Sequence, residues 1–297
     1  MIKQEVSLGT AQFGLDYGIT NKTGKVSLQI ASEILDAAWE NNIKCLDTAQ
    51  GYGDVEEVLE KTIRNGKDFK ITTKLKASSD RIITVNDIED WEQRLFMTIR
   101  RLKNAEVHTL LVHSIDDLKK DGAGFLADWL LSLKTRGVVQ RVGVSIYDER
   151  DLAAVPTELQ DVVQVPVSLY DQRLVKNGIW SDLKNRGSLI QARSIYLQGL
   201  ILSPSTNLPD WIPDHLKRHH RQLEKLAAKL GLRLIDLAVQ YIRSVPQIDT
   251  LIAGVTSVDE LIQLKNSAAS MNCLDCVNWS KWAFDEEHIL DPRLWPR

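Results

Sequence analysis

Eight short runs of apolar or β-branched residues recur along the whole sequence, and they limit the folds that it can adopt. They are VSLGT near Val6, KCLDTA near Lys44, FKITTKL near Phe69, HTLLVHS near His108, RVGVSI near Arg141, VVQVPVS near Val162, SLIQARS near Ser188 and TLIAGV near Thr250. These runs are apolar almost throughout instead of alternating, which is typical of parallel strands covered on both faces. Eight such units favour a (β/α)8 barrel.

The segments between these runs carry apolar residues three and four positions apart, which predicts helices. In DIEDWEQRLFMTIRRLK, one helical face carries Trp91, Leu95, Ile99 and Leu102. The doubly wound sheet is the alternative fold, but it usually has G-x-G-x-x-G after its first strand, and this sequence lacks that motif. We therefore expect a TIM barrel forming one domain over residues 1–297, with residues 272–297 as a tail.

Composition and charge exclude several classes of partner. The chain has 37 Lys and Arg against 40 Asp and Glu, a formal net charge of −3, and no dense basic face suited to nucleic acid. No stretch is apolar for the roughly 20 residues that a membrane helix needs. MIKQEVSLGTAQ lacks the pattern of a secretory signal. We expect a soluble cytoplasmic protein that binds neither nucleic acid nor membrane.

The three cysteines are an odd number and predict no disulfide framework. Cys273 and Cys276 form a lone C-x-x-C in the tail, without the second pair that a zinc site of this kind needs. A redox pair would be expected at the start of a helix that follows a strand. We interpret these residues as reduced thiols and expect no metal site.

Four protonatable side chains follow three successive predicted strands. Asp47 ends the second strand, Tyr52 lies in the loop after it, Lys74 ends the third strand and His113 ends the fourth. Each has a structural explanation when taken alone, as a helix cap, a packed ring, a solvated amine or a core histidine. In a barrel, however, the C-terminal ends of the strands converge on one mouth, where the chemistry of this fold is found. Their conjunction therefore predicts a shared site.

The four side chains have complementary chemistry. A free tyrosine has a pKa of about 10, which is too high for efficient proton exchange at neutral pH. A nearby ammonium lowers that pKa, so we expect Lys74 to lower the pKa of Tyr52, and Asp47 to keep Lys74 charged. His113 would donate a hydrogen bond to a substrate oxygen beside the Tyr52 hydroxyl. The arrangement predicts a general acid with its supporting groups.

These residues resemble the signature of the aldo-keto reductase family. That signature reads D-T-A, then Y-G and an acidic helix start, as in LDTAQGYGDVEE here. The resemblance extends to LLVHS, GVS after the fifth strand and IAGVTSVDEL at the eighth. It implies a (β/α)8 barrel that binds NADPH, less often NADH, at its C-terminal mouth and reduces a small-molecule aldehyde or ketone. The family's catalytic residues match Asp47, Tyr52, Lys74 and His113, with Tyr52 as the acid.

The same resemblance implies a set of cofactor contacts. Ser145 and Gln164 would hold the nicotinamide carboxamide, and Arg193 takes the place of an aromatic residue that often stacks on the nicotinamide ring. The phosphate and adenosine contacts would be Ser194, Leu197 and Gly199 near the pyrophosphate, and Gly254, Thr256, Ser257 and Gln263 at the adenosine end. Helix N-termini and backbone amides at these two turns suit anions.

Three positions depart from the family pattern. Ile146 stands where an asparagine is common in GVSN, so one carboxamide contact is lost or is supplied by another group. Arg193 adds a positive charge beside a ring that becomes cationic on oxidation. The turn GVTSVDE has no Lys or Arg for a 2′-phosphate, and Asp259 or Glu260 would repel one. The backbone amides and hydroxyls of this turn could still hold a phosphate. We expect NADPH, with NADH as the alternative.

The candidate substrate contacts lie in loops that follow the strands, namely Gln12, Phe13, Tyr17, Tyr147 and Trp180. LGTAQFGLDYGI and ARSIYLQGL resemble a bacterial branch of the family associated with sugar metabolism, which suggests a sugar-derived carbonyl. Two other functions remain open. Lys74 could form a Schiff base, as in an aldolase, although Asp47 would raise its pKa. The chain could also be a cofactor-binding regulator with little turnover.

Overall fold

The computed structural model describes residues 4–19, 21, 23–176, 179–270, 274 and 277–296. Eight parallel strands close into one barrel in chain order, because β1 pairs with both β2 and β8. The strands are β1 (Glu5–Gly9), β2 (Cys45–Asp47), β3 (Phe69–Leu75), β4 (Ala105–Val112), β5 (Arg141–Ser145), β6 (Val162–Pro166), β7 (Leu189–Arg193) and β8 (Thr250–Gly254). The predicted (β/α)8 barrel is confirmed, and each of its strands falls on one of the apolar runs.

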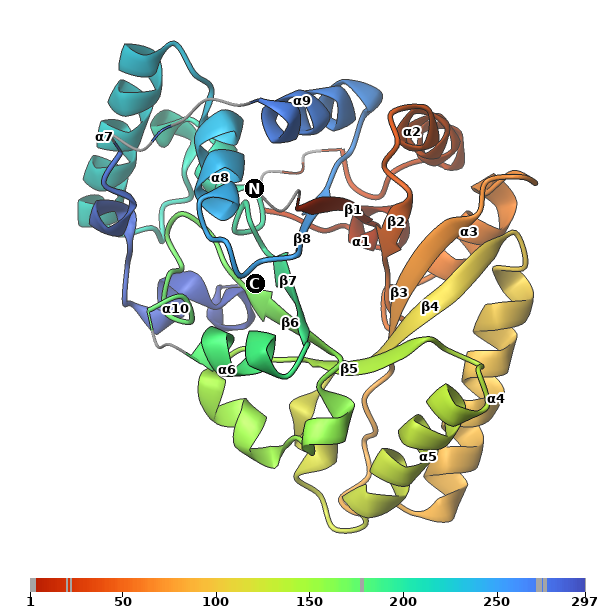
Figure 1. Ribbon diagram of the computed structural model, residues 1–297. Helices are drawn as coiled ribbons and strands as arrows, with labels where there is room; N and C mark the ends of the chain where they lie inside the picture. Colours follow the sequence, from red (N-terminus) through yellow and green to blue (C-terminus); the bar gives the residue numbers. More distant parts are fainter. Residues whose placement is uncertain are drawn as a thin grey trace.

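Helices pack around the outside of the strands (Figure 1). They are α1 (Ala11–Gly14), α2 (Leu28–Glu40), α3 (Val55–Thr62), α4 (Val85–Arg101), α5 (Ala123–Thr135), α6 (Ile179–Asn185), α7 (Asp214–Leu230), α8 (Leu234–Arg243), α9 (Val258–Ala269) and α10 (Glu287–Leu290). Within these described ranges, no helix is both long and apolar enough to span a membrane.

Helix α4 shows how the pattern produces the packing. Its start is fixed by a capping box in which Thr84 and Asp87 bond each other's backbone amides. Trp91 and Leu95 are buried on the face that the periodicity predicts. Trp91 stacks on Trp129 of α5 with 6.5 Å between the ring centroids, which joins neighbouring helices over the barrel.

The connection from β5 to β6 departs from the simple alternation of strands and helices. Two 3-10 helices, η2 (Glu149–Ala154) and η3 (Thr157–Leu159), replace an α-helix there. Pro156 lies between them, where it cannot donate a backbone hydrogen bond and disfavours a helical residue before it. This short connection follows the strand that ends at Ser145 and leaves the Tyr147 loop at the barrel mouth.

Two glycines position the loop that carries Tyr52. A Cβ added at Gly14, the last residue of α1, would lie 1.9 Å from the Tyr52 carbonyl oxygen and 2.8 Å from the Val55 nitrogen. Gly53 has φ of +58°, and a Cβ there would lie 2.3 Å from the Gly14 oxygen. Only glycine permits this approach of two backbones. The first loop of the barrel therefore rests directly on the Tyr52 loop.

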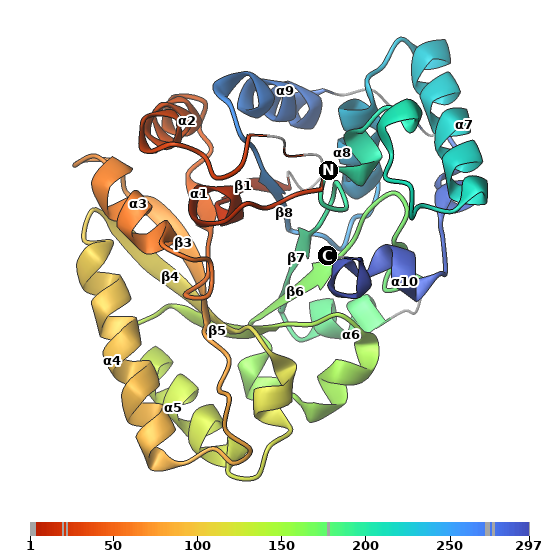
Figure 2. The same cartoon turned by 180° about the vertical axis from the view of Figure 1, so that it is seen from behind.

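The C-terminal segment packs against the barrel beside β6 and β7 (Figure 2). The Phe284 amide donates to the Tyr170 carbonyl over 2.9 Å, and the Trp295 indole donates to the Ile289 carbonyl over 2.9 Å. Trp295 is buried and lies 5.1 Å from the ring of Trp211. These contacts hold the residues near Arg293 at the edge of the mouth. Cys273 and Cys276 lie outside the described residues.

Candidate active site

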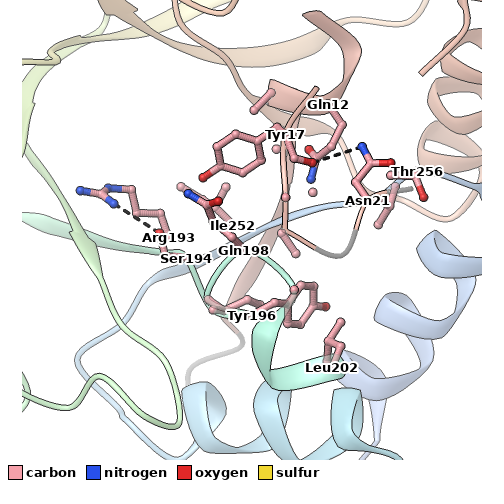
Figure 3. Close-up of a pocket in the computed structure, with 18 of the residues that line it drawn as sticks. Gln12, Tyr17, Asn21, Arg193, Ser194, Tyr196, Gln198, Leu202, Ile252 and Thr256 are labelled. Carbon is pink, nitrogen blue, oxygen red and sulfur yellow. Dashed lines mark hydrogen bonds between the residues drawn. The ribbon is translucent and has the colours of Figure 1, made fainter. Parts of the chain in front are cut away.

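A cavity of about 870 Å³ opens at the C-terminal ends of the strands, within the size range of small-molecule sites. Its lining comes from the first loop, from the ends of β2 and β4, from the turns after β5, β7 and β8, and from the C-terminal segment. Figure 3 shows Arg193 at one end of this cavity and Thr256 at the other, with Tyr17 lying toward the Arg193 end.

A buried ion pair lies beneath the Tyr52 end. Lys74 is fully buried, and its Nζ donates to Asp47 Oδ2 over 2.7 Å and to the Thr48 carbonyl over 2.8 Å. The other carboxylate oxygen of Asp47 accepts a hydrogen bond from Gln164 Nε2 over 2.7 Å. Pairing of β2 with β3 brings Asp47 and Lys74 together. Burial lowers the pKa of Lys74 below its usual value, and the charge of Asp47 offsets only part of that shift.

Tyr52 and His113 meet above this ion pair. Their ring centroids are 5.9 Å apart in an edge-to-face arrangement, and Lys74 Nζ lies 5.2 Å from the Tyr52 centroid. Burial raises the pKa of Tyr52, and the charge of Asp47 raises it further, while Arg193 lowers it. This direction is opposite to the one expected from the sequence, because burial and the charge of Asp47 dominate. Tyr52 therefore keeps its proton at neutral pH.

The His113 imidazole is neutral at physiological pH. Burial, which has the largest effect, and the charges of Lys74 and Arg193 together lower its pKa to about 3. A neutral imidazole carries one N–H, so His113 retains a single hydrogen-bond donor without adding charge to the cavity. This state matches the role expected for it, that of donating to a substrate oxygen beside Tyr52.

Arg193 and Tyr147 form the wall at the same end. The Arg193 guanidinium carbon lies 4.1 Å from the Tyr147 ring centroid, and that of Arg293 lies 3.5 Å from it. Arg193 also donates to the Ile146 carbonyl over 3.1 Å and to Ser194 Oγ over 3.3 Å. Its guanidinium is thus fixed on three sides. Ile146, which lacks the amide of the commoner asparagine, contributes its backbone to this wall.

The turn after β7 has an unusual backbone. Ser194, Leu197 and Gln198 have φ of 58°, 47° and 52°, and Gly199 has φ of 92°. Residues other than glycine rarely adopt positive φ, and such conformations concentrate at ligand-binding sites. Turns of this type also present backbone amides to anions.

Different groups line the Thr256 end. Glu260 Oε2 accepts from the Thr256 amide over 2.6 Å and from its hydroxyl over 3.1 Å. A Cβ at Gly254 would lie 2.3 Å from Gln12 Oε1, so glycine leaves room for that side chain. Ser257 faces its own helix, where it accepts from the Glu260 amide and begins α9.

Comparisons with known proteins agree with this geometry. A model of the aldo/keto reductase family matches residues 5–274. The chain belongs to the aldo/keto reductase family. None of the curated protein sequences matches it.

Solved structures resemble this aldo/keto reductase in fold. An aldo-keto reductase from Bacillus halodurans in its holo form has a TM-score of 0.72 at 18% identity, covering 96% of this chain and 90% of that one. A glycerol dehydrogenase from Gluconobacter oxydans has a TM-score of 0.68 at 18% identity, with coverage of 91% and 88%. An aldo/keto reductase from Klebsiella pneumoniae in complex with NADP and acetate has a TM-score of 0.68 at 17% identity, with coverage of 98% and 99%.

The cavity of the reductase brings together most of the residues singled out from its sequence. The predicted residues that line it are Gln12, Tyr17, Asp47, Tyr52, His113, Tyr147, Arg193, Ser194, Gly199, Gly254, Thr256 and Gln263. The others do not line it, namely Phe13, Lys74, Ser145, Gln164, Trp180, Leu197 and Ser257. Phe13 and Trp180 are buried in the core. Lys74 and Gln164 instead support Asp47 from below.

Other lining residues of the reductase were missed by sequence reasoning. Tyr196, Arg233 and Arg293 all face the cavity. Arg233 lies at the start of α8 and pairs with Asp236 over 2.8 Å, so this basic residue comes from outside the GVTSVDE turn. Arg293 lies in the C-terminal segment. No local motif marks either arginine, because the fold alone brings these segments to the mouth.

Proposed function

We propose that this aldo/keto reductase uses NADPH to reduce an aldehyde or ketone to the alcohol, with Tyr52 as the proton donor. The observation that carries the proposal is the meeting of Tyr52 and His113 on the cavity wall above the buried Asp47–Lys74 pair. Tyrosine, neutral histidine and a supporting ion pair form a set suited to protonating a carbonyl oxygen. Membership of the aldo/keto reductase family supports the same reaction.

Each residue has a distinct role in this proposal. Tyr52 holds a proton at its hydroxyl and releases it to the substrate oxygen as that oxygen gains negative charge. The neutral His113 donates a hydrogen bond to the same oxygen and orients it. Asp47 holds the Lys74 ammonium in place near Tyr52. That positive charge can stabilise the negative charge that Tyr52 gains when it loses its proton. NADPH, when bound, supplies the hydride.

The cavity fits an extended dinucleotide. Arg193 would support the nicotinamide, the strained turn at Ser194 and Gly199 would meet the pyrophosphate, and Thr256 and Gln263 would line the adenosine end. Gln164 Oε1 is buried beneath the cavity without a hydrogen-bond partner among the described residues, so this side chain would have to turn toward the cavity to accept from a carboxamide N–H. NADP in the related Klebsiella structure supports the class of cofactor. NADH is the alternative, because Glu260 lies beside Thr256.

The proposed substrate is a small carbonyl compound, and a sugar-derived one fits the polar lining. Tyr17 and Tyr147 provide hydroxyl groups around the reacting end. The glycerol dehydrogenase among the structural relatives supports a polyhydroxylated substrate or product. A Schiff base at Lys74 has less support, because its Nζ is buried and already bonded to Asp47 and Thr48.

Cofactor titration followed by turnover tests this function. Purified protein is titrated with NADPH and separately with NADH while its tryptophan fluorescence is followed, and a panel of aldehydes and ketones is then supplied with the tighter cofactor. We expect saturable binding with NADPH the tighter, and many turnovers per protein chain. Saturable binding without multiple turnover would favour a cofactor-binding regulator. Failure to bind either cofactor would contradict the proposal.

A further inference from the structure

Three cationic side chains lie at or beneath the Tyr52 end of the cavity, and two of them already have carboxylate partners. Lys74 pairs with Asp47 over 2.7 Å. Arg293 pairs with Asp291 through Nη2 at 2.5 Å and through Nε at 2.9 Å. The bonds of Arg193 go instead to two neutral acceptors. Among the described residues, no carboxylate forms an ion pair with Arg193.

The position of Arg193 makes this charge relevant to the chemistry. It lines the same cavity as Tyr52 and His113, and its charge lowers the pKa of both. The side chain is only partly exposed, so solvent screens it incompletely. Its contacts with Tyr147, Ile146 and Ser194 hold the guanidinium in place. A rigid, partly desolvated cation of this kind is a preformed site for an anion.

Oxidation of the cofactor would bring a second positive charge next to Arg193. A nicotinamide ring bound against Arg193 becomes cationic when it is oxidised, so two positive charges would then be adjacent. A negative group on the other reactant would offset both charges. Arg293 adds a second guanidinium at the same end, since both arginines line the cavity and pack on the Tyr147 ring.

We propose that the substrate carries an anionic group, a carboxylate or a phosphate, which pairs with Arg193 and is flanked by Arg293. This inference rests on the proposed reduction of a carbonyl and adds the substrate's charge to it. The competing explanation is that Arg193 binds a phosphate of the cofactor. Against a contact with the 2′-phosphate, Figure 3 shows Arg193 at the end of the cavity opposite Thr256, and its bonds turn it toward Ile146. A contact with the pyrophosphate near Ser194 is tested by the NADPH affinity of Arg193→Gln.

Matched substrates test the inference with NADPH held at saturation. Succinic semialdehyde is compared with butanal for the carboxylate, and glycolaldehyde phosphate with glycolaldehyde for the phosphate. We expect one of the two anions to raise kcat/KM over its neutral partner by about tenfold to a hundredfold, as one charge-assisted hydrogen bond would. The ratio should fall toward one in Arg193→Gln, chiefly through KM, and recover in part in Arg193→Lys. Arg293→Gln should lower the same ratio by less.

Arg136→Gln is the matched control, because Arg136 is an exposed arginine paired with Glu92 away from the cavity. It should keep the wild-type ratio. Binding of butyrate and of butyramide to the NADP-saturated protein, followed by tryptophan fluorescence, gives a readout without turnover. If butyrate binds more tightly than butyramide in the wild type but not in Arg193→Gln, the result would support a carboxylate site.

Two results would overturn the inference. Turnover of the neutral aldehydes with no preference for either anion would leave the proposed reduction standing and remove the anion site. Weaker NADPH binding in Arg193→Gln, with the substrate ratio unchanged, would assign Arg193 to the cofactor. The proposed function is judged separately, by turnover of the broader panel of aldehydes and ketones.

Discussion

Lys74 Nζ lies 2.7 Å from Asp47 Oδ2, and both groups are buried beneath the cavity wall formed by Tyr52 and His113. Taking two charges out of water is costly, and here the cost is offset by close geometry and by further bonds to Thr48 and Gln164. The pair places a fixed dipole under the proposed proton donor. Its value to the protein is therefore expected to lie in catalysis more than in stability.

Removing one charge of the pair tests whether the pair serves catalysis more than stability. Lys74→Met leaves Asp47 buried without its partner, so the free energy of unfolding should fall by about 3–5 kcal/mol. The double variant Lys74→Met/Asp47→Leu should recover most of that stability but no reductase activity. Urea unfolding of the three proteins checks the first expectation, and NADPH consumption checks the second. A double variant as unstable as the single one would contradict this account.

Tyr52→Phe should lower kcat by about 10²–10⁴-fold, because it removes the transferable proton and keeps the ring. NADPH affinity should change less than about twofold, since the hydroxyl serves the reaction and leaves cofactor contacts intact. Tyr241→Phe is the matched control, because Tyr241 is buried outside the cavity. Wild-type turnover in Tyr52→Phe would exclude Tyr52 as the acid.

The strands were predictable because each is a short apolar run that parallel pairing buries on both faces. The barrel order then places Asp47, Tyr52 and His113 at one mouth, so strand ends alone predict their meeting. The missing α-helix after β5 could also have been predicted, since Pro156 interrupts the only helical stretch between Ser145 and Val162. These features depend on local sequence, which is why they can be deduced from it.

Other features depend on contacts between distant segments. Arg293 reaches Tyr147 only because the C-terminal segment folds back over the mouth, and no periodicity signals that path. The raised pKa of Tyr52 reflects how deeply it is buried, which a strand-end position does not reveal. The bond from Gln164 to Asp47 joins residues 117 positions apart and gives Gln164 a role beside the carboxamide contact expected of it.

Glu260→Gln should shift cofactor preference toward NADPH. The Glu260 carboxylate accepts from the amide and hydroxyl of Thr256, so it occupies donors that a 2′-phosphate would use and also repels that phosphate. We expect the NADPH affinity to rise by about tenfold with little change for NADH. Asp259→Asn is the control, because it removes the same charge from the first turn of α9. Equal gains for both variants would indicate a long-range charge effect only.

Gly14→Ala tests whether the first loop positions Tyr52. The new Cβ would meet the Tyr52 carbonyl at 1.9 Å, so the Tyr52 loop must move. A displacement of about 1 Å at a reacting group costs about a hundredfold in rate, and we expect that loss in kcat. Gly124→Ala in α5 is the control, because its Cβ meets no atom within 4 Å. Unchanged kcat in Gly14→Ala would show that the loop adapts without moving the hydroxyl.

His113 predicts a specific dependence of stability on pH. Its pKa is about 3 in the folded protein and about 6.5 in an unfolded chain. Between these values the unfolded state binds a proton that the folded state does not, so stability falls as the pH decreases, by about 1.4 kcal/mol per pH unit from this residue alone. Above pH of about 6.5 the contribution is fully present.

His113→Asn should remove this contribution, so its free energy of unfolding should decrease less steeply than that of the wild type from about pH 6.5 downward. Urea unfolding at intervals across that range gives the two slopes, and comparing slopes cancels any constant loss from the substitution itself. His288→Asn provides the control, since His288 is exposed at the surface. Identical slopes for the wild type and His113→Asn would mean that His113 takes up a proton over the same pH range in the folded and unfolded states. Its role as a neutral donor would then fail.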